Sequence, residues 1–220
     1  MKNISVNSSV EIVGNFPCNY PDDTIKNEPI FFRSSFDFAY DSGGVITRGF
    51  LDSLPDYVKN QPISFDSRVH MLMPTWIPAI AGWHHDDVPR SLPNGQPNYE
   101  SPEYESEHII GLVNAHISPT EFALGCENFP ILKEEVYKHY NQMVDESLLS
   151  GSLKSFKSES GLLYFFDYHT WHRATVAEQR GWRWFGRVSW GNESCLSPRN
   201  DIRRQVQVYL TSVNEGWYYE

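Results

Sequence analysis

The sequence predicts a mainly β fold, a sandwich or barrel of short strands with one inserted helix. Short runs of aromatic and β-branched residues recur along the chain, separated by Gly and Pro, of which there are 14 each. One segment, at about residues 131–149, has the apolar spacing of a helix that covers a core. The length of 220 residues is that of one domain, so we expect a single domain over residues 1–220.

The first third of the chain is predicted to be strands and loops. Residues 1–30 form an arm of short runs interrupted by polar residues and prolines, and residues 30–40 are aromatic and strand-like. A short helix is expected within 48–60. Residues 63–81 give one or two strands with two prolines among them, and proline belongs at the edges or bulges of sheets.

A long polar loop at residues 90–106 separates these strands from the rest of the sheet. Loops of this length inside a compact domain are typical of lids or mobile segments, and the sequence leaves that choice open. Strands are predicted at 108–118 and 120–125. Residues 161–190 then read as strand, loop, strand, turn and strand.

The helix at about 131–149 is the one convincing helix in the sequence. Its apolar residues recur at three- and four-residue steps, and Gly151 is suited to end it. We expect it to be a structural cover whose buried face carries Val136, Tyr140, Met143 and Val144.

Charge and cysteine content exclude several classes of protein. The formal net charge is −10, whereas binding to duplex nucleic acid needs clustered Lys and Arg, so we expect no such partner. Cys18, Cys126 and Cys195 are widely spaced without a C-x-x-C motif, which predicts neither a disulfide framework nor a cysteine zinc site. The chain lacks a signal-peptide pattern and a long apolar stretch, so we expect a cytoplasmic protein that does not span a membrane. Its oligomeric state is not predicted.

Four ionisable residues follow one another directly after an apolar run, at residues 84–87 (HHDD). Imidazole and carboxylate groups are suited to a divalent metal. In an extended chain residues i and i+2 point the same way, so an H-x-D pair can reach one ion. Either His84 with Asp86 or His85 with Asp87 satisfies this spacing.

A third ligand has to come from elsewhere in the chain. The candidates are His172 and His169, in the segment FFDYHTWHRATV. Two histidines and one carboxylate on one face of an ion leave positions open for small molecules, as in non-haem Fe(II) oxygenases. For the remaining histidines, His70, His108, His116 and His139, we expect roles in packing or at the surface.

The strand at residues 182–190 (WRWFGRVSW) has two chemically different faces. Period-two alternation places Arg183, Phe185, Arg187 and Ser189 on one face and the tryptophans on the other. Burial of a guanidinium without a partner lowers the stability of the fold by roughly several kcal/mol. Arginines that point into the sandwich therefore need anionic partners. A small dicarboxylate is a natural partner, since Arg binds carboxylates bidentately.

Taken together, the motif His84-x-Asp86, His172 and Arg183, 11 residues further on, resemble the Fe(II)- and 2-oxoglutarate-dependent dioxygenases. The resemblance extends over residues 65–190. It implies a double-stranded β-helix, a cupin-like jelly roll with one or more covering helices. It also implies that His84, Asp86 and His172 bind Fe(II) and that Arg183 holds the distal carboxylate of 2-oxoglutarate.

The resemblance leaves some roles open. Ser189 would assist Arg183, and Arg187 would be an alternative anchor or a contact to an anionic substrate, for which Arg90 is a second candidate. Because the acid of the motif is present, hydroxylation with succinate and CO2 as co-products is favoured over halogenation.

The substrate is expected to be a small molecule or a peptide. The alternatives are a cupin-like metal-binding protein without 2-oxoglutarate chemistry, or a member of the same fold that modifies nucleic-acid bases, because aromatic residues interleaved with arginine can stack on single strands.

Overall fold

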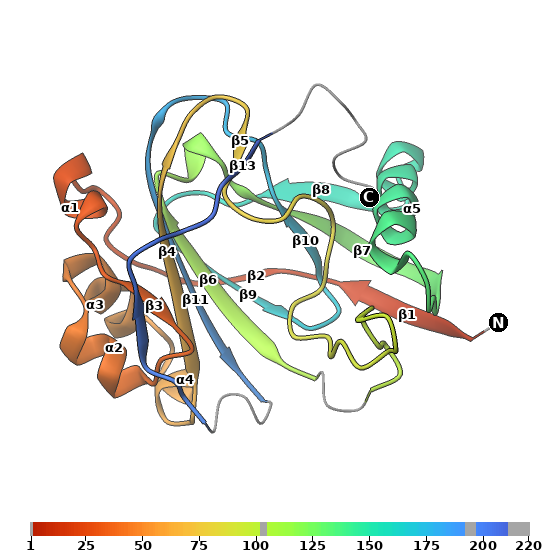
Figure 1. Cartoon of the computed structure of the whole chain (residues 1–220), viewed down its shortest axis with the longest axis horizontal. Helices are drawn as coiled ribbons and strands as arrows, with labels where there is room; N and C mark the ends of the chain where they lie inside the picture. The colour runs from red at the N-terminus through yellow and green to blue at the C-terminus, as the bar shows by residue number, and fades with distance from the viewer. Residues whose placement is uncertain (1, 102–104, 192–196, 211–220) are drawn as a thin grey trace.

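Two antiparallel sheets form a β-sandwich in the computed structural model, which describes residues 2–101, 105–191 and 197–210 (Figure 1). The first sheet has five strands in the order β2 (Glu11–Asn15), β9 (Leu162–Asp167), β6 (Glu107–Val113), β11 (Gly181–Trp190) and β4 (Ser64–Leu72). The second has β1 (Asn3–Ser8), β7 (Thr120–Pro130) and β10 (Trp171–Ala174) in order, with β8 (Lys154–Lys157) also paired to β7. The predicted mainly β, jelly-roll-like class is confirmed.

Helices cover the outside of both sheets (Figure 1). Four short ones precede β4 or lie beside it: α1 (Asp22–Lys26), α2 (Phe36–Ser42), α3 (Val45–Asp52) and α4 (Asp56–Lys59). The longer α5 (Val136–Ser150) lies beside β7. The small elements are η2 (Ala115–Ile117) and two strand pairs, β3 (Ile30–Phe32) with β12 (Asp201–Arg203) and β5 (Trp76–Ile77) with β13 (Tyr209–Leu210).

Three of the four apolar clusters among the described residues form layers in this arrangement. One lies between the five-stranded sheet and helices α1–α4, and a second lies between the other sheet and α5. The third fills the sandwich itself with Ile110, Leu112, Phe122, Tyr164 and Phe166, contributed by β6, β7 and β9. Two of these aromatic rings, Phe122 and Phe166, lie against His172 of β10.

Strand β11 has the two faces that its sequence predicts. Trp184, Val188 and Trp190 are buried under the helices. On the opposite face, Arg183 lies across from His70 of β4, Arg187 lies across from Asp66 of β4, and Ser189 lies across from His108 of β6. The polar row therefore belongs to the face that lines the sandwich.

The prediction of a strand over residues 30–40 is wrong beyond Phe32, because residues 36–42 form helix α2. The Ser35 hydroxyl accepts a hydrogen bond from the Phe38 N–H at 3.3 Å, which caps the helix. Phe36 and Tyr40, four residues apart, stack at 5.9 Å. The cap and the i,i+4 pair outweigh the strand preference of the aromatic residues.

The remaining boundaries agree with the sequence in part. The short helix expected within 48–60 is confirmed as α3 and α4, but α1 lies in the arm that we expected to hold strands and loops alone. Helix α5 starts five residues later than expected, after Glu135 with φ of 44°, and ends at Gly151, whose φ is 82°. Over its described residues, the predicted loop at 90–106 contains no helix or strand; residues 102–104 lie outside the description.

Cys18 and Cys126 are free thiols, and Cys195 lies outside the described residues. Within the described ranges, no helix combines the length and the apolar character needed to cross a membrane.

Candidate metal centre

The backbone brings His84 and His172 side by side. His172 lies on β10, and His84 lies in the segment that follows β5. The two residues form an isolated antiparallel bridge in which the His84 N–H donates to the His172 carbonyl at 3.0 Å and the reverse bond measures 3.2 Å. Their ring centroids are 4.5 Å apart. The bridge thus fixes a pair of imidazoles that are 88 positions apart in the chain.

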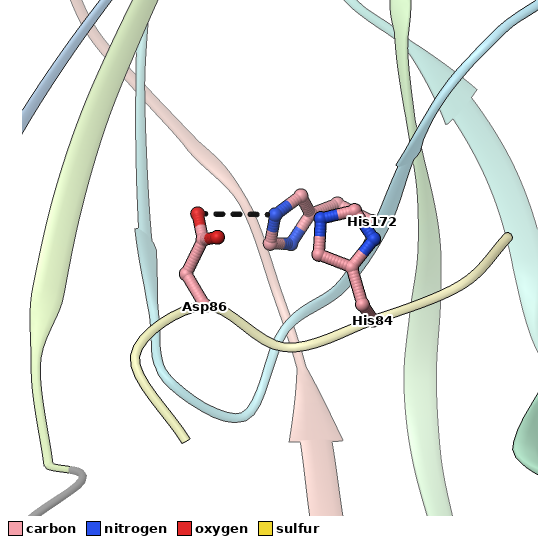
Figure 2. Close-up of side chains that lie close together, drawn as sticks. All are labelled: His84, Asp86 and His172. Atoms are coloured by element: carbon pink, nitrogen blue, oxygen red, sulfur yellow. Dashed lines mark ion pairs between the residues drawn. The ribbon is translucent and has the colours of Figure 1, made fainter. Parts of the chain in front are cut away.

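Asp86 completes a cluster with these two histidines (Figure 2). One ligand atom from each residue lies within 4.8 Å of the others, and His172 Nε2 is 3.2 Å from Asp86 Oδ2. His172 is buried, whereas His84 and Asp86 are partly exposed. Two imidazoles and one carboxylate at these separations can bind one divalent metal ion and leave further positions open.

Hydrogen bonds select the tautomer of both histidines. Nδ1 of His84 lies 3.0 Å from the Gly82 carbonyl, and Nδ1 of His172 lies 3.0 Å from the Thr170 carbonyl. A carbonyl oxygen only accepts, so each Nδ1 carries the proton and donates it. In the neutral form of each histidine, Nε2 then holds the lone pair that can bind a metal.

The protonation states also suit a metal. Burial and the neighbouring His172 lower the pKa of His84 to about 4, so His84 is neutral at neutral pH. Burial alone would raise the pKa of Asp86, but Arg187 and His172 outweigh it and hold that pKa well below its ordinary value. At neutral pH, His84 therefore presents a neutral imidazole and Asp86 an ionised carboxylate to a metal ion.

The other combinations considered from the sequence do not form a cluster. His85 is buried and its ring stacks on Trp171, with centroids 3.7 Å apart. Asp87 is exposed. His169 lies beside Tyr168 with ring centroids 4.2 Å apart. Of the two H-x-D frames, the structure brings His84 and Asp86 to His172.

Helix α5 holds the segment that carries His84 and Asp86. The Trp83 N–H donates to Asn141 Oδ1 at 2.5 Å, and Trp83 Nε1 donates to Asp145 at 2.8 Å. Arg173 of β10 lies over the Trp83 ring at 4.2 Å and pairs with Asp145 at 3.3 Å. At Gly82, φ is 104° and a Cβ would come within 2.6 Å of the Asn141 amide, so glycine is required there.

Arg187 lies against the cluster. Its guanidinium forms an ion pair with Asp86 and a second with Asp66 at 3.5 Å. Burial would lower the pKa of Arg187, but Asp86 and Asp66 raise it above its ordinary value. Arg187 is therefore a charged neighbour of the metal ligands with two carboxylates already beside it.

Arg183 has a different environment. It is buried, and its Nε donates to the Ser118 carbonyl at 2.7 Å. The guanidinium also lies 5.5 Å from the Phe185 ring centroid. Among the described residues no carboxylate forms an ion pair with it, and burial lowers its pKa to about 9. Burying a guanidinium without a carboxylate partner costs free energy, which an anion beside it would offset.

The remaining histidines and Ser189 lie outside the candidate metal cluster. The Ser189 hydroxyl lies 2.8 Å from Nδ1 of His108, and His108 is fully buried. His70 is also buried, whereas His116 and His139 are exposed. The packing and surface roles expected for these four histidines agree with these positions.

A pocket of about 1220 Å³ opens at the metal ligands. His84 and Asp86 lie in its wall. One end is formed by β4, Arg203 and residues 205–207, and the other by α5 together with Arg90. The volume is large enough for a small molecule beside the cluster.

Sequence reasoning missed the supporting residues. Asp66 alternates with Arg68 and His70 along β4, and the same period-two pattern that was applied to β11 would have placed them on one face. Asn141 and Asp145, four residues apart on α5, gave no signal of their partner, because Trp83 is 58 and 62 positions away.

Comparison with known proteins adds little to this geometry. No family model matches the chain, and no curated protein matches it. Among solved structures, a similar chain is the crystal structure of HygX from Streptomyces hygroscopicus with iron bound, at 13% sequence identity and a TM-score of 0.36. The alignment covers 61% of this chain and 60% of that one. The assignment of the site depends on its own residues.

Proposed function

We propose that the protein is a non-haem Fe(II)- and 2-oxoglutarate-dependent oxygenase. The observation that carries the proposal is the cluster of His84, Asp86 and His172 on the same sandwich as Arg183, a buried cation without a carboxylate partner among the described residues. Two imidazoles and one carboxylate are the donor set of Fe(II) oxygenases. In both imidazoles Nδ1 faces a backbone carbonyl, which leaves Nε2 as the atom for ligation.

Arg183 is the better anchor for the co-substrate. It shares a strand face with Arg187, but Arg187 already contacts Asp86 and Asp66, whereas Arg183 contacts a carbonyl and an aromatic ring. The distal carboxylate of 2-oxoglutarate would supply the missing negative charge. Ser189 is bonded to His108, so its expected assistance to Arg183 has no support from this geometry.

In this mechanism the residues of the chain bind the iron, orient 2-oxoglutarate and shield the site from water. His84, Asp86 and His172 would hold the iron, and Arg183 would orient 2-oxoglutarate. When bound, the iron would activate O2, the oxidant that converts 2-oxoglutarate to succinate and CO2 and oxidises the substrate. Phe122 and Phe166, with ring centroids 6.2 and 5.0 Å from that of His172, exclude water from one side of the site. Because Asp86 supplies a carboxylate, we favour hydroxylation.

The proposal is tested by adding Fe(II) and 2-oxoglutarate to the protein without oxygen. A weak visible charge-transfer band is expected, together with slow formation of succinate when oxygen is admitted. His172→Ala should abolish the band, whereas His139→Ala, a histidine exposed on α5, should leave it unchanged.

The competing functions give different results. Tightly held zinc, no band, and 2-oxoglutarate binding that is unaffected by Arg183→Ala would contradict the proposal and favour a cupin-like metal-binding protein. Domain extent over all 220 residues, a small-molecule or peptide substrate and a cytoplasmic location remain parts of the proposal.

A further inference from the structure

Three arginines gather at one end of the pocket, beside the carboxylates of Asp66, Asp86 and Asp87. They are Arg68 of β4, Arg187 of β11 and Arg203 of β12, and we refer to them as the arginine cluster. Arg68 and Arg203 line the pocket, and Arg187 contacts Asp86, which also lines it. The cluster therefore lies next to the candidate metal ligands.

Asp66 is shared within this cluster. It lies 3.5 Å from Arg187 and 3.9 Å from Arg68, the longer distance being close to the limit of an ion pair. The guanidinium of Arg68 otherwise donates to two backbone carbonyls, those of Phe31 and Ser67. Burial lowers the pKa of Arg68, and both Arg187 and Arg203 lower it further against the opposing effect of Asp66.

Arg203 has no carboxylate partner among the described residues. Its guanidinium lies 3.5 Å from the centroid of the Phe32 ring, which holds it at the edge of the pocket. The Coulomb interaction between Arg203 and Arg68 is repulsive, so an anion between them would stabilise both.

The other cations of the pocket wall are neutralised, Arg90 excepted. Lys138 pairs with Glu135 at 3.3 Å, and Arg173 pairs with Glu121 at 2.8 Å and with Asp145. Arg90 lies at the α5 end, against Tyr137. The excess of positive charge beside the metal ligands is thus at the β4 end.

A metal ion increases this excess. Asp86 is the second carboxylate beside Arg187, and its charge would be taken up by the bound ion. 2-Oxoglutarate would bring its two charges to the ion and to Arg183. Two carboxylates, Asp66 and Asp87, are then left to balance the three arginines.

We propose that the arginine cluster binds an oxyanion group, a carboxylate or a phosphate, of the small-molecule substrate. The inference rests on the proposed function for the reaction, and it adds the class of substrate. Guanidinium groups bind both anions through paired, charge-assisted hydrogen bonds. The anionic group would hold the substrate at the β4 end with the rest of the molecule toward His84 and Asp86.

The test uses methyl phosphate and acetate as probes. The protein is loaded with Mn(II) and saturated with 2-oxoglutarate, and each anion is titrated at constant ionic strength while its ³¹P or ¹³C relaxation is measured. We expect saturable relaxation by Mn(II), with binding weakened about tenfold in Arg68→Gln and at least about threefold in Arg203→Gln. Arg180→Gln, at an exposed arginine outside the pocket, should bind as the unaltered protein does.

Each outcome has a defined meaning. Tighter binding of methyl phosphate indicates a phosphorylated substrate, and tighter binding of acetate indicates a carboxylic acid. Binding of neither anion, or binding that is equal in Arg203→Gln and the unaltered protein, overturns the inference. Because Arg203 is exposed, that variant keeps the test valid if Arg68→Gln fails to fold.

Failure of the proposed function gives a different result. The binding of Mn(II) and 2-oxoglutarate is measured first in the same samples. If neither binds, the reaction is excluded. The arginine cluster is then tested in the metal-free protein by the rise in Tm that methyl phosphate causes. Arg203→Gln should reduce this rise at least twofold. An equal rise in that variant and in the unaltered protein overturns the inference.

Discussion

Arg183 carries a positive charge onto the inner face of the sandwich, where its Nε donates a hydrogen bond to the Ser118 carbonyl. A pKa of about 9 in place of the ordinary 12.5 means that burial disfavours the charged form by several kcal/mol, roughly. The guanidinium destabilises the protein unless a ligand compensates it. A site that is costly without its ligand is a sign of selection for binding.

Replacing Arg183 by methionine should therefore stabilise the ligand-free protein. We expect the free energy of unfolding to rise by about 1 kcal/mol or more, because a buried charge is exchanged for an apolar side chain of similar length. The stabilisation that 2-oxoglutarate gives to the Mn(II)-loaded protein should disappear in the same variant. Urea unfolding with and without 2-oxoglutarate measures both effects.

The matched control is Arg180→Met, at an exposed position, which should change neither quantity. A ligand-free Arg183→Met protein that is less stable than the original, and that still gains stability from 2-oxoglutarate, would contradict this account of Arg183.

The sequence was sufficient to identify candidate metal ligands, but its spacing alone did not decide between the two H-x-D pairs. The i, i+2 rule fits His84 with Asp86 and His85 with Asp87 equally well. The choice depends on contacts distant in sequence: His84 forms a β-bridge with His172, and His85 stacks on Trp171. Such contacts cannot be derived from local spacing.

At the scale of elements, α5 does more than cover a sheet. Its buried residues Val136, Tyr140 and Val144 pack as the sequence predicts. Its Asn141 and Asp145 also bind the backbone and the indole of Trp83, the residue before His84. The helix therefore positions the segment that carries two of the three candidate ligands.

Removal of one of these contacts should weaken metal binding without unfolding the protein. In Asn141→Ala the Trp83 N–H loses its acceptor, and we expect the affinity for Mn(II) to fall by about 10- to 100-fold, the range for residues that orient ligands. Electron paramagnetic resonance of free Mn(II) gives the affinity, and circular dichroism checks the fold.

Gln142→Ala is the control on the same helix, because Gln142 bonds to Glu146 and not to the ligand segment. Equal Mn(II) affinities in the two variants would show that α5 is only a structural cover.

Secondary structure was predictable where periodicity was strong and was missed where a short local contact decided it. The alternation of β11 and the apolar face of α5 gave correct faces. Helix α2 was missed, since its cap is one hydroxyl at Ser35 and its aromatic residues favour strands.

At the scale of the whole molecule, buried neutral histidines make stability depend on pH. Burial lowers the pKa of His108 to about 3, with Asp86 opposing and Arg187 adding to the effect. Burial, Arg183 and Arg68 lower the pKa of His70 to about 3. Both are neutral in the fold, whereas in the unfolded chain they gain protons below about pH 6.5.

The sign of the dependence follows from the number of protons bound. The unfolded chain binds more protons between pH 6.5 and 3, so stability is complete above pH 6.5 and is lost as pH falls. Each histidine should reduce the free energy of unfolding of the metal-free protein by about 2 kcal/mol between pH 7 and pH 5.

Urea unfolding at several pH values tests this dependence. His108→Gln keeps a hydrogen-bonding side chain that does not titrate. In this variant the loss of unfolding free energy between pH 7 and pH 5 should be smaller by the contribution of one histidine. His139→Gln, on the exposed side of α5, should leave the profile unchanged, and identical slopes in the two variants would refute the assignment.

The sandwich itself was predictable from the pattern of short strands, since alternation and turn residues are local. The pocket was not, because β4, Arg203, residues 205–207 and α5 come together only in the folded chain. The arginine cluster belongs to the same category: Arg68 and Arg203 are 135 positions apart in the chain.

The central claim is that one site holds Fe(II) through His84, Asp86 and His172 and holds 2-oxoglutarate through Arg183. A crystal structure of the protein grown with Mn(II) and 2-oxoglutarate measures this directly. We expect the ion bound to Nε2 of both histidines and to the Asp86 carboxylate, with the distal carboxylate of 2-oxoglutarate paired to Arg183. An ion bound at other residues, or 2-oxoglutarate paired to Arg187 and Arg68 with Arg183 still lacking an anion, would contradict the account.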